Sequence, residues 1–173
     1  MILIYSALPG GQSAESPIDA SLLTSLTDLS DLIVDKSARG TSGANADEAP
    51  QRIFDGQTNT KWCETSTAAP YVMFRTDTPV TVSAYALWSA NDTANHQGRN
   101  PKCWTLWGSA DGENWTAIDR VYDGQMNTAN YTSSAYAAGA SVPGCSYFVL
   151  VVHSTVDGTT MQLSEMQLFG TVS

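Results

Sequence analysis

The chain has 173 residues, of which 42% are hydrophobic and 14% charged, with 17 acidic and 8 basic side chains and a net charge of −9. This length suits one domain with a buried core and a short extension. Because the acidic balance repels phosphate backbones and anionic lipid, we expect no nucleic-acid partner. No run approaches the ~18 consecutive apolar residues of a transmembrane helix, so we also expect no membrane insertion.

The first 30 residues differ in pattern from the rest of the chain. Ser16 is a suitable helix N-cap, and Pro17 suits the first helical position. Apolar residues then recur at near-helical spacing, at Ile18, Leu22, Leu26 and Leu29. We therefore predict a short helix or docking segment in an extension over residues 1–30, followed by one domain over residues 31–173.

From about Asp31 the apolar pattern has a period of two, which is typical of antiparallel strands with one buried face. The expected strands are Leu32–Ala38, Pro70–Thr76, Val80–Ser89, Cys103–Ser109, Trp115–Val121, Ser146–Ser154 and Met161–Phe169. The segment "NADEAPQRIFDG" can form one helical turn before Gly56. Short strands joined by unequal loops predict an all-β jelly-roll sandwich of about eight antiparallel strands.

The three cysteines are Cys63, Cys103 and Cys145, an odd set without a C-x-x-C pair. This spacing argues against a zinc site. One disulfide with a free thiol and three buried thiols both stay open, and the burial habit of free cysteine favours the second. Few charges combined with many Ser, Thr, Asn and Gly residues favour a location outside the cell.

The segment "RIFDGQTNTKWCE", residues 52–64, concentrates oxygen atoms around one glycine. Asp55, Asn59 and Thr60 are the kind of ligand that a hard cation such as calcium prefers. The spacing of an EF-hand loop is absent, so the residues alone favour a simple Asp55-Gly56 turn. Glu165 lies inside a predicted C-terminal strand and gains a metal role only if that strand ends beside this loop.

Four segments together carry a resemblance to a known family: "IFDGQTNTKW", "RNPKCWTLWGSADGENWTAID", "YFVLVV" and "MQLSEMQLFG". In order and spacing they resemble the discoidin, or coagulation factor V/VIII type C, domain, and in style the bacterial family 32 carbohydrate-binding modules. The similarity runs from about residue 30 to 170. It implies a galactose-binding-domain-like β-sandwich with a structural calcium ion. The implied calcium ligands are the carbonyls of Arg52, Gln57 and Met166, the side chains of Asp55 and Glu165, and both oxygens of Thr60.

The resemblance also implies a sugar site in loops at one end of the sandwich, where polar groups bond ring hydroxyls and an aromatic ring packs on the sugar. The polar loop Ser89–Asn100 lies where such a site is usually built. The expected ligand-binding residues are Glu64, Asn91, Asp92, His96, Arg99 and Asn100. Alternatively, His96 is an idle surface residue and Arg99 pairs with Asp92 to shape the loop.

No aromatic residue lies between Asn91 and Asn100. The candidate stacking rings lie elsewhere, at Tyr131, Tyr136 and Tyr147, although strand packing explains any single one more simply. Core or inter-sheet packing is the expected role of most of Trp62, Trp104, Trp107 and Trp115.

The sequence contains no nucleophile elbow, zinc-protease or P-loop motif, so we expect no catalysis. The interpretation it favours is a non-catalytic carbohydrate-binding module of a larger secreted or cell-surface glycan-active protein. The alternative is a protein–protein or cell-surface adhesion module on the same fold without a sugar site. A hydrolase would need a deep cleft with two close carboxylates.

Overall fold

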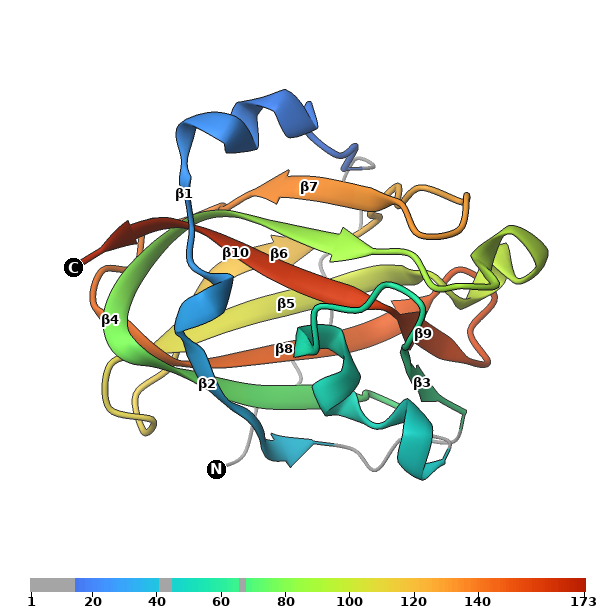
Figure 1. Ribbon diagram of the computed structural model, residues 1–173, viewed down its shortest axis with the longest axis horizontal. Coiled ribbons are helices and arrows are strands. Elements are labelled where there is room, and N and C mark those ends of the chain that lie inside the picture. The colour runs from blue at the N-terminus through green and yellow to red at the C-terminus, as the bar shows by residue number, and fades with distance from the viewer. Residues whose placement is uncertain (1–14, 41–44, 66–67) are drawn as a thin grey trace.

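The computed structural model describes residues 15–40, 45–65 and 68–173. Its strands form two layers of antiparallel sheet (Figure 1). One layer contains β1 (Thr27–Asp28), β10 (Glu165–Val172), the second half of β4 (Tyr71–Trp88) and β7 (Ser133–Ala137). The other contains β2 (Ile33–Gly40), the first half of β4, β8 (Cys145–Thr155), β5 (Pro101–Ser109) and β6 (Thr116–Val121). This arrangement confirms the predicted β-sandwich.

Shorter elements decorate the sandwich. Strands β3 (Trp62–Glu64) and β9 (Met161–Leu163) pair with each other as a separate two-stranded sheet. The helical elements of the described residues are 3₁₀ turns: η1 (Ala20–Ser25), η2 (Ser30–Leu32), η3 (Ala46–Glu48), η4 (Pro50–Phe54), η5 (Thr93–Asn95) and η6 (Gln97–Arg99). None of the helices in the described ranges is long and apolar enough to cross a membrane.

Strand β4 differs from the sequence prediction of two strands. It is continuous through Asp77 and Pro79, and its pairing register with β8 shifts between Arg75 and Val80. That irregularity lets one strand bend and serve both layers. The predicted strand Met161–Phe169, in contrast, divides at Ser164 into β9 and β10, which pair with different partners.

Strands β1, β3 and β7, which contain two, three and five residues, are not predictable from the sequence pattern. Strands this short carry too few residues to display an alternating pattern of their own. Their conformation depends on the partner strand that each of them meets.

The core between the layers is rich in aromatic side chains. Trp62 and Trp104 are fully buried, as predicted. Tyr136 is also buried and lies 5.0 Å, ring centre to ring centre, from Trp104 in an edge-to-face contact. Tyr136 is therefore a core residue and not an exposed stacking ring. Cys63, Cys103 and Cys145 are buried free thiols, the state that the sequence favoured.

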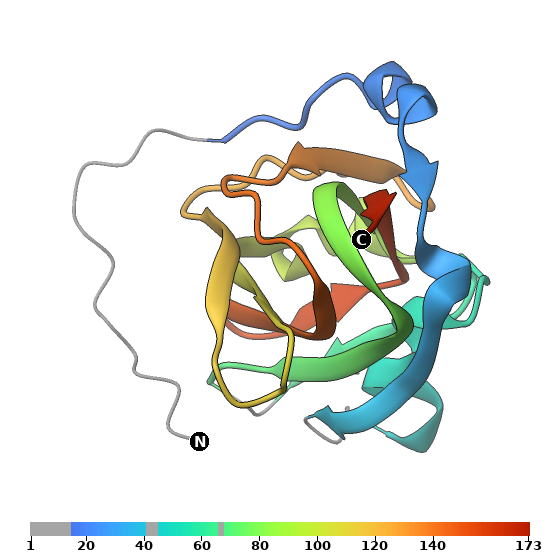
Figure 2. The same cartoon turned by 90° about the vertical axis from the view of Figure 1, so that its left-hand side faces the viewer.

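The described part of the N-terminal extension, from residue 15 onward, packs on the outer face of the layer that contains β7 and β10 (Figure 2). Three apolar residues of this segment, Ile18, Leu23 and Leu26, pack against the sheet. Their partners on the sheet are Ala84, Ala86 and Phe169. Strand β1 then pairs with β10, and Leu29 is fully buried. The prediction of Ser16 as N-cap and Pro17 as first helical residue is wrong. The helix η1 begins at Ala20, and Asp19 caps it by accepting a hydrogen bond from the Ser21 amide.

A buried hydrogen-bond chain links three strands within the sandwich. The Tyr85 hydroxyl donates to Asp119 Oδ2 at 2.6 Å and accepts from Trp104 Nε1 at 2.8 Å. Burial raises the pKa of the Asp119 carboxyl and, more strongly, that of the Tyr85 hydroxyl. A single hydroxyl thus satisfies two buried polar groups.

We predict that Tyr85→Phe lowers the free energy of unfolding by about 2–4 kcal/mol, because it leaves Trp104 Nε1 without its acceptor and Asp119 Oδ2 without the tyrosine donor. Urea denaturation measures the loss. Tyr147→Phe, on the half-buried face of β8, is the matched control and should change stability little. Equal stabilities of the wild type and Tyr85→Phe would show that this buried hydrogen-bond chain contributes nothing to the free energy of unfolding.

Candidate ligand-binding and metal-binding sites

The polar loop Ser89–Asn100 is a compact connection between β4 and β5, built on the turns η5 and η6. Thr93, fully buried, anchors it from within: its hydroxyl accepts the Ala90 amide at 2.8 Å and the side-chain amide of Gln162 at 3.3 Å. The loop is therefore fixed to the small sheet that β9 forms with β3. Such fixing favours pre-organised side chains over mobile ones.

A second loop, residues 122–132 between β6 and β7, runs beside the first at the same end of the sandwich (Figure 1). The Ser89 and Thr132 backbones are joined at 3.0 Å, the Ala94 amide donates to Asn130 Oδ1 at 2.7 Å, and Asn100 Nδ2 donates to the Asn127 carbonyl at 3.0 Å. The two loops thus form one surface.

The loop between β8 and β9 also contacts the loop Ser89–Asn100. The amides of Val156 and Asp157 donate to the carbonyls of Asn100 and Gly98 at 3.1 and 2.9 Å. A Cβ at Gly98 would lie 2.6 Å from Asp157 Oδ2, so this close approach requires glycine.

Asp92 lies beside three basic side chains, those of Lys61, Arg99 and His96, on the side of the loop that faces β3. Its Oδ2 lies 2.9 Å from Lys61 Nζ, 3.6 Å from Arg99 Nη1 and 4.0 Å from His96 Nε2. Burial alone would raise the pKa of the Asp92 carboxyl, but the Lys61 hydrogen bond and the neighbouring positive charges outweigh it and lower that pKa. The alternative interpretation, that Arg99 pairs with Asp92 and shapes the loop, describes part of this arrangement.

The basic side chains around Asp92 differ in how much of their surface is exposed to solvent. The side chains of His96 and Arg99 are 44% and 28% exposed, whereas that of Lys61 is only 11% exposed. Arg99 contacts Asp92 and Gln162 through Nη1 alone among the contacts found within the described residues, at 3.6 and 3.5 Å.

The structure does not bring all the predicted ligand residues to this surface. Glu64 is 3% exposed within β3, and Asn100 is 2% exposed and holds the neighbouring loop. Asn91 is half-buried, with Nδ2 3.4 Å from the Asn59 carbonyl. Lys61 and Gln162 also contact this cluster and were not predicted from the sequence, although Lys61 directly precedes Trp62 in the family motif.

A cavity of about 400 Å³ is lined in part by Gln97 and Asn100 of the same loop. Its lining also includes the buried side chain of Met126 and the ion pair between Lys102 and Asp123, whose Nζ and Oδ1 atoms are 3.8 Å apart. Loop Ser89–Asn100 therefore contributes residues both to the charged cluster around Asp92 and to this cavity.

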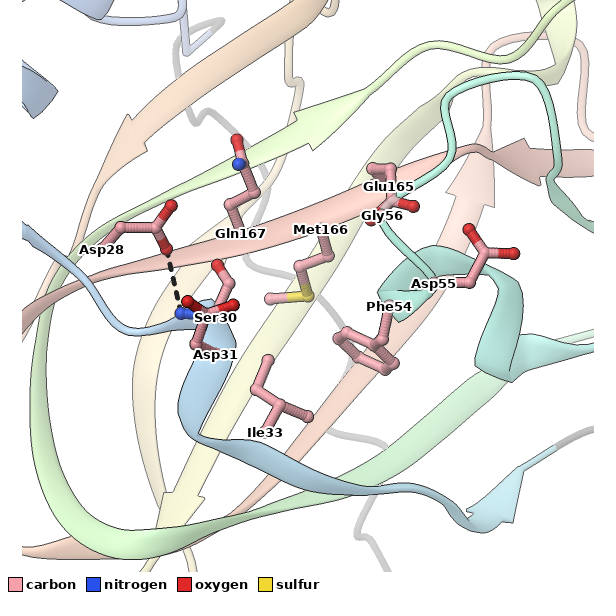
Figure 3. Close-up of a pocket in the computed structure, with 10 residues that line it drawn as sticks. All are labelled: Asp28, Ser30, Asp31, Ile33, Phe54, Asp55, Gly56, Glu165, Met166 and Gln167. Atoms are coloured by element: carbon pink, nitrogen blue, oxygen red, sulfur yellow. Dashed lines mark hydrogen bonds between the residues drawn. The ribbon is translucent and has the colours of Figure 1, made fainter.

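The predicted metal ligands lie together at the start of β10. The Thr60 hydroxyl lies 2.8 Å from Asp55 Oδ2 and 2.9 Å from the Gln57 carbonyl, and Glu165 Oε1 accepts the Gln57 amide at 2.8 Å. Figure 3 shows Asp55 and Glu165 lining the same pocket. The Arg52 guanidinium lies 3.5 Å from Asp55, while the predicted role of this residue involves only its carbonyl.

The electrostatics of the neighbouring Asp55 and Glu165 carboxyl groups suit a cation. Burial, with the added effect of the Asp55 carboxyl, raises the pKa of Glu165 to about 7. Two neighbouring carboxylates that disfavour each other's charge are stabilised by a divalent ion, and the carbonyl and hydroxyl oxygens beside them are typical calcium ligands. No group of three or more Cys, His, Asp or Glu side chains suited to a metal occurs in the described ranges. Only two of the predicted calcium ligands, Asp55 and Glu165, are carboxylates. The oxygen atoms of the predicted set fit calcium.

Comparison with known proteins identifies the family. A family model of the F5/8 type C domain matches residues 35–142, more than half of the chain. This chain belongs to the F5/8 type C domain family. A search of curated proteins finds no match.

Solved structures with similar folds have low sequence identity to this F5/8 type C domain. An F5/8 type C domain from Bacteroides fragilis superimposes with a TM-score of 0.65 at 18% identity, covering 82% of this chain and 97% of that one. A module from Clostridium perfringens in complex with GalNAc-β-1,3-galactose gives 0.64 at 16% identity, covering 83% and 100%. The family 32 module of Clostridium perfringens NanJ in complex with galactose gives 0.63 at 14% identity, covering 83% and 98%. At these identities the similarity establishes the shared fold.

We predict that Asp92→Asn destabilises the domain at pH 7 by about 1 kcal/mol, a modest value because a third of the Asp92 side chain is exposed. Since the pKa of Asp92 is lowered on folding, its contribution is complete above the ordinary value of 3.8 and disappears as pH falls through the folded-state value. Denaturation at several pH values measures this. Asp77→Asn, an exposed carboxylate on β4, is the control, and a difference that persists at low pH would contradict the prediction.

Proposed function

We propose that this F5/8 type C domain is a non-catalytic carbohydrate-binding module that uses the loop surface around Ser89–Asn100. The observation that carries the proposal is the partly exposed Arg99 fork, held beside Asp92 and His96 on a fixed loop. Two structures of the same fold contain bound galactose or GalNAc-β-1,3-galactose, which supports a sugar as the ligand.

The chemistry of this surface suits ring hydroxyls. A guanidinium donates in a planar fork that can span neighbouring hydroxyls, and a neutral imidazole both donates and accepts. Lys61 and Gln162 hold Asp92 and Arg99 from behind, so a ligand meets groups that are already oriented. Pre-organisation reduces the entropy lost on binding.

In this proposal the domain holds a larger glycan-active protein, secreted or on the cell surface, on its substrate. Similar folds occur as modules of glycoside hydrolases, such as the third family 32 module of a family 31 enzyme from Clostridium perfringens. A shallow loop surface binds a single sugar weakly. Repeated modules or a multivalent glycan would then supply avidity.

A glycan array followed by calorimetry tests the function, with galactose, N-acetyl sugars, mannose and uronic acids as probes. We predict that Arg99→Ala weakens binding of the best probe at least tenfold, about 1.4 kcal/mol. Arg120→Ala, on β6 against the Trp107 ring, is the matched control and should bind normally. If the wild-type protein binds no probe, the sugar function is wrong and the adhesion module becomes the better hypothesis.

We also propose a structural calcium ion at the start of β10. The carbonyls of Arg52, Gln57 and Met166 and the oxygens of Asp55, Thr60 and Glu165 would hold it. The ion would neutralise the two carboxylates and link the η4 loop to the last strand. Ordered loop oxygens, the buried Glu165 carboxyl and the part-buried Asp55 carboxyl beside it support this assignment.

We predict that EDTA lowers the melting temperature and that added Ca²⁺ restores it, because an ion bound only by the folded state contributes about 2.7 kcal/mol at a hundredfold excess over Kd. Asp55→Asn and Glu165→Gln should abolish this response. Asp47→Asn, a neighbouring carboxylate that is 96% exposed, should keep it. A melting temperature that does not respond to EDTA or Ca²⁺ would disprove the calcium site.

A further inference from the structure

The cavity of about 400 Å³ lies where three loops meet the start of β5. Its walls come from the polar loop Ser89–Asn100, the β6–β7 loop, the β8–β9 loop and Lys102. This volume falls within the range of ~300–1,000 Å³ that small-ligand pockets span. The residues that line the cavity differ from those that surround Asp92, so it is a separate site.

Backbone hydrogen bonds hold the β6–β7 wall of this cavity in place. The Gly124 amide donates to the Lys102 carbonyl at 2.8 Å, which fixes the loop to β5. The Glu15 amide donates to the Asp123 carbonyl at 2.8 Å, and the Glu15 carbonyl accepts the Gln125 amide at 3.0 Å. Because the wall is fixed before a ligand arrives, binding loses less conformational entropy.

Asn100 has an unsatisfied hydrogen-bond acceptor in its side chain and lines this cavity. The residue is 2% exposed, and its Nδ2 donates to the Asn127 carbonyl at 3.0 Å. Its Oδ1 has no hydrogen-bond partner among the residues that the structure describes. A buried acceptor without a donor costs folding free energy, so a ligand that brings an N–H or O–H donor recovers part of that cost.

The other polar groups of the lining balance in charge. Lys102 Nζ and Asp123 Oδ1 lie 3.8 Å apart, beyond the ~2.7–3.2 Å of a hydrogen bond, so both keep hydrogen-bonding capacity. Gln97, Gln125 and Thr128 add exposed amide and hydroxyl groups that both donate and accept. A lining with one cation and one anion favours an uncharged polar ligand.

Two apolar side chains belong to the same lining. Val156 is 58% exposed and Met126 is buried. A methyl group of a ligand gains free energy when it leaves water for contact with such side chains. An uncharged group that combines an N–H donor, a carbonyl acceptor and a methyl group is an acetamide. The composition of the lining therefore matches an acetamido group better than a hydroxyl, a carboxylate or an ammonium.

We infer that this cavity binds the acetamido group of an N-acetylhexosamine and is a second glycan subsite of the domain. The inference rests on the proposed glycan-binding function, because the loop that carries Arg99 also forms the cavity. The acetamido N–H donates to Asn100 Oδ1, and its carbonyl accepts a hydrogen bond from a side-chain amide of the lining. Its methyl group contacts Val156 and Met126.

The test measures binding of the methyl glycosides of N-acetylglucosamine and N-acetylgalactosamine by calorimetry. Val156→Asp replaces the apolar contact with a charge and should weaken binding of the better glycoside at least about tenfold. Val156→Ile keeps an apolar side chain and should bind within about threefold. Val172→Asp, at the far end of β10 and 54% exposed, is the matched control and should bind like the wild type. Since both valines are exposed, all three variants should keep the melting temperature of the wild type.

The ligand itself provides an independent comparison. The matching methyl hexoside has a hydroxyl in place of the acetamido group, so the wild type should bind it at least about tenfold more weakly. For Val156→Asp the two affinities should converge. In an NMR titration with the N-acetyl glycoside, the backbone amides of Gly124, Gln125 and Val156 should shift. Equal affinity of the wild type for the two compounds would contradict an acetamido site.

The outcomes separate this inference from the proposed function. Arg99→Ala should keep the preference for the N-acetyl glycoside, because Arg99 does not line the cavity. A preference that Arg99→Ala removes and Val156→Asp keeps would overturn the second subsite but leave the glycan-binding function standing. Binding of Nε-acetyl-lysine in the cavity without binding of either N-acetyl glycoside would overturn the sugar as the source of the acetamido group. A wild-type protein that binds no sugar would overturn both proposals.

Discussion

The bend in strand β4 is the constraint on which the rest of the molecule depends. Its first half pairs with β2 and β8 and its second half with β7 and β10, so one strand belongs to both layers of the sandwich. The register shift near Pro79 makes this possible by interrupting the ladder with β8. Because the layers share a strand, the position of its end at Trp88 is fixed relative to both.

That fixed end explains why the polar loop can be orderly without regular secondary structure. Ser89, the first residue after β4, is fully buried and bonds the neighbouring loop through both backbone and side chain. Further along the loop, Thr93 is bonded to Gln162 of β9, and Asn100 is bonded to the carbonyl of Asn127 in the neighbouring loop. Rigid attachment at several points lets a short loop carry an ion cluster and form part of a cavity wall.

The two candidate sites differ in how they balance charge. Around Asp92, cations and an anion already satisfy one another, which leaves the remaining donors of Arg99 for a neutral polar ligand. At Glu165, burial and then the neighbouring Asp55 carboxyl raise the pKa, so the charged form of Glu165 is disfavoured. The first arrangement suits hydroxyl groups, and the second suits a cation.

Much of the scaffold was predictable because it depends on local pattern. Alternating residues predicted β5 and β6, an apolar run over residues 147–152 predicted β8, and the Asp-Gly turns and tryptophan-rich segments pointed to the family. The short strands and the single long β4 were not predictable, since they depend on partners distant in sequence. The sites were predictable only as segments: Asp92, His96 and Arg99 meet as expected, whereas Glu64 and Asn100 are buried.

By itself, the sequence determined the sandwich class, the family and the loop that carries the polar side chains, because each of these depends on residues that are close together in the sequence. Tertiary structure alone decided that Lys61 and Gln162 support Asp92 and Arg99, that Glu165 reaches the Asp55 loop, and that Tyr131 takes a left-handed conformation at the surface. These contacts join residues 30 to more than 100 positions apart, or depend on hydrogen bonds from another loop. Only the folded chain brings such groups within bonding distance.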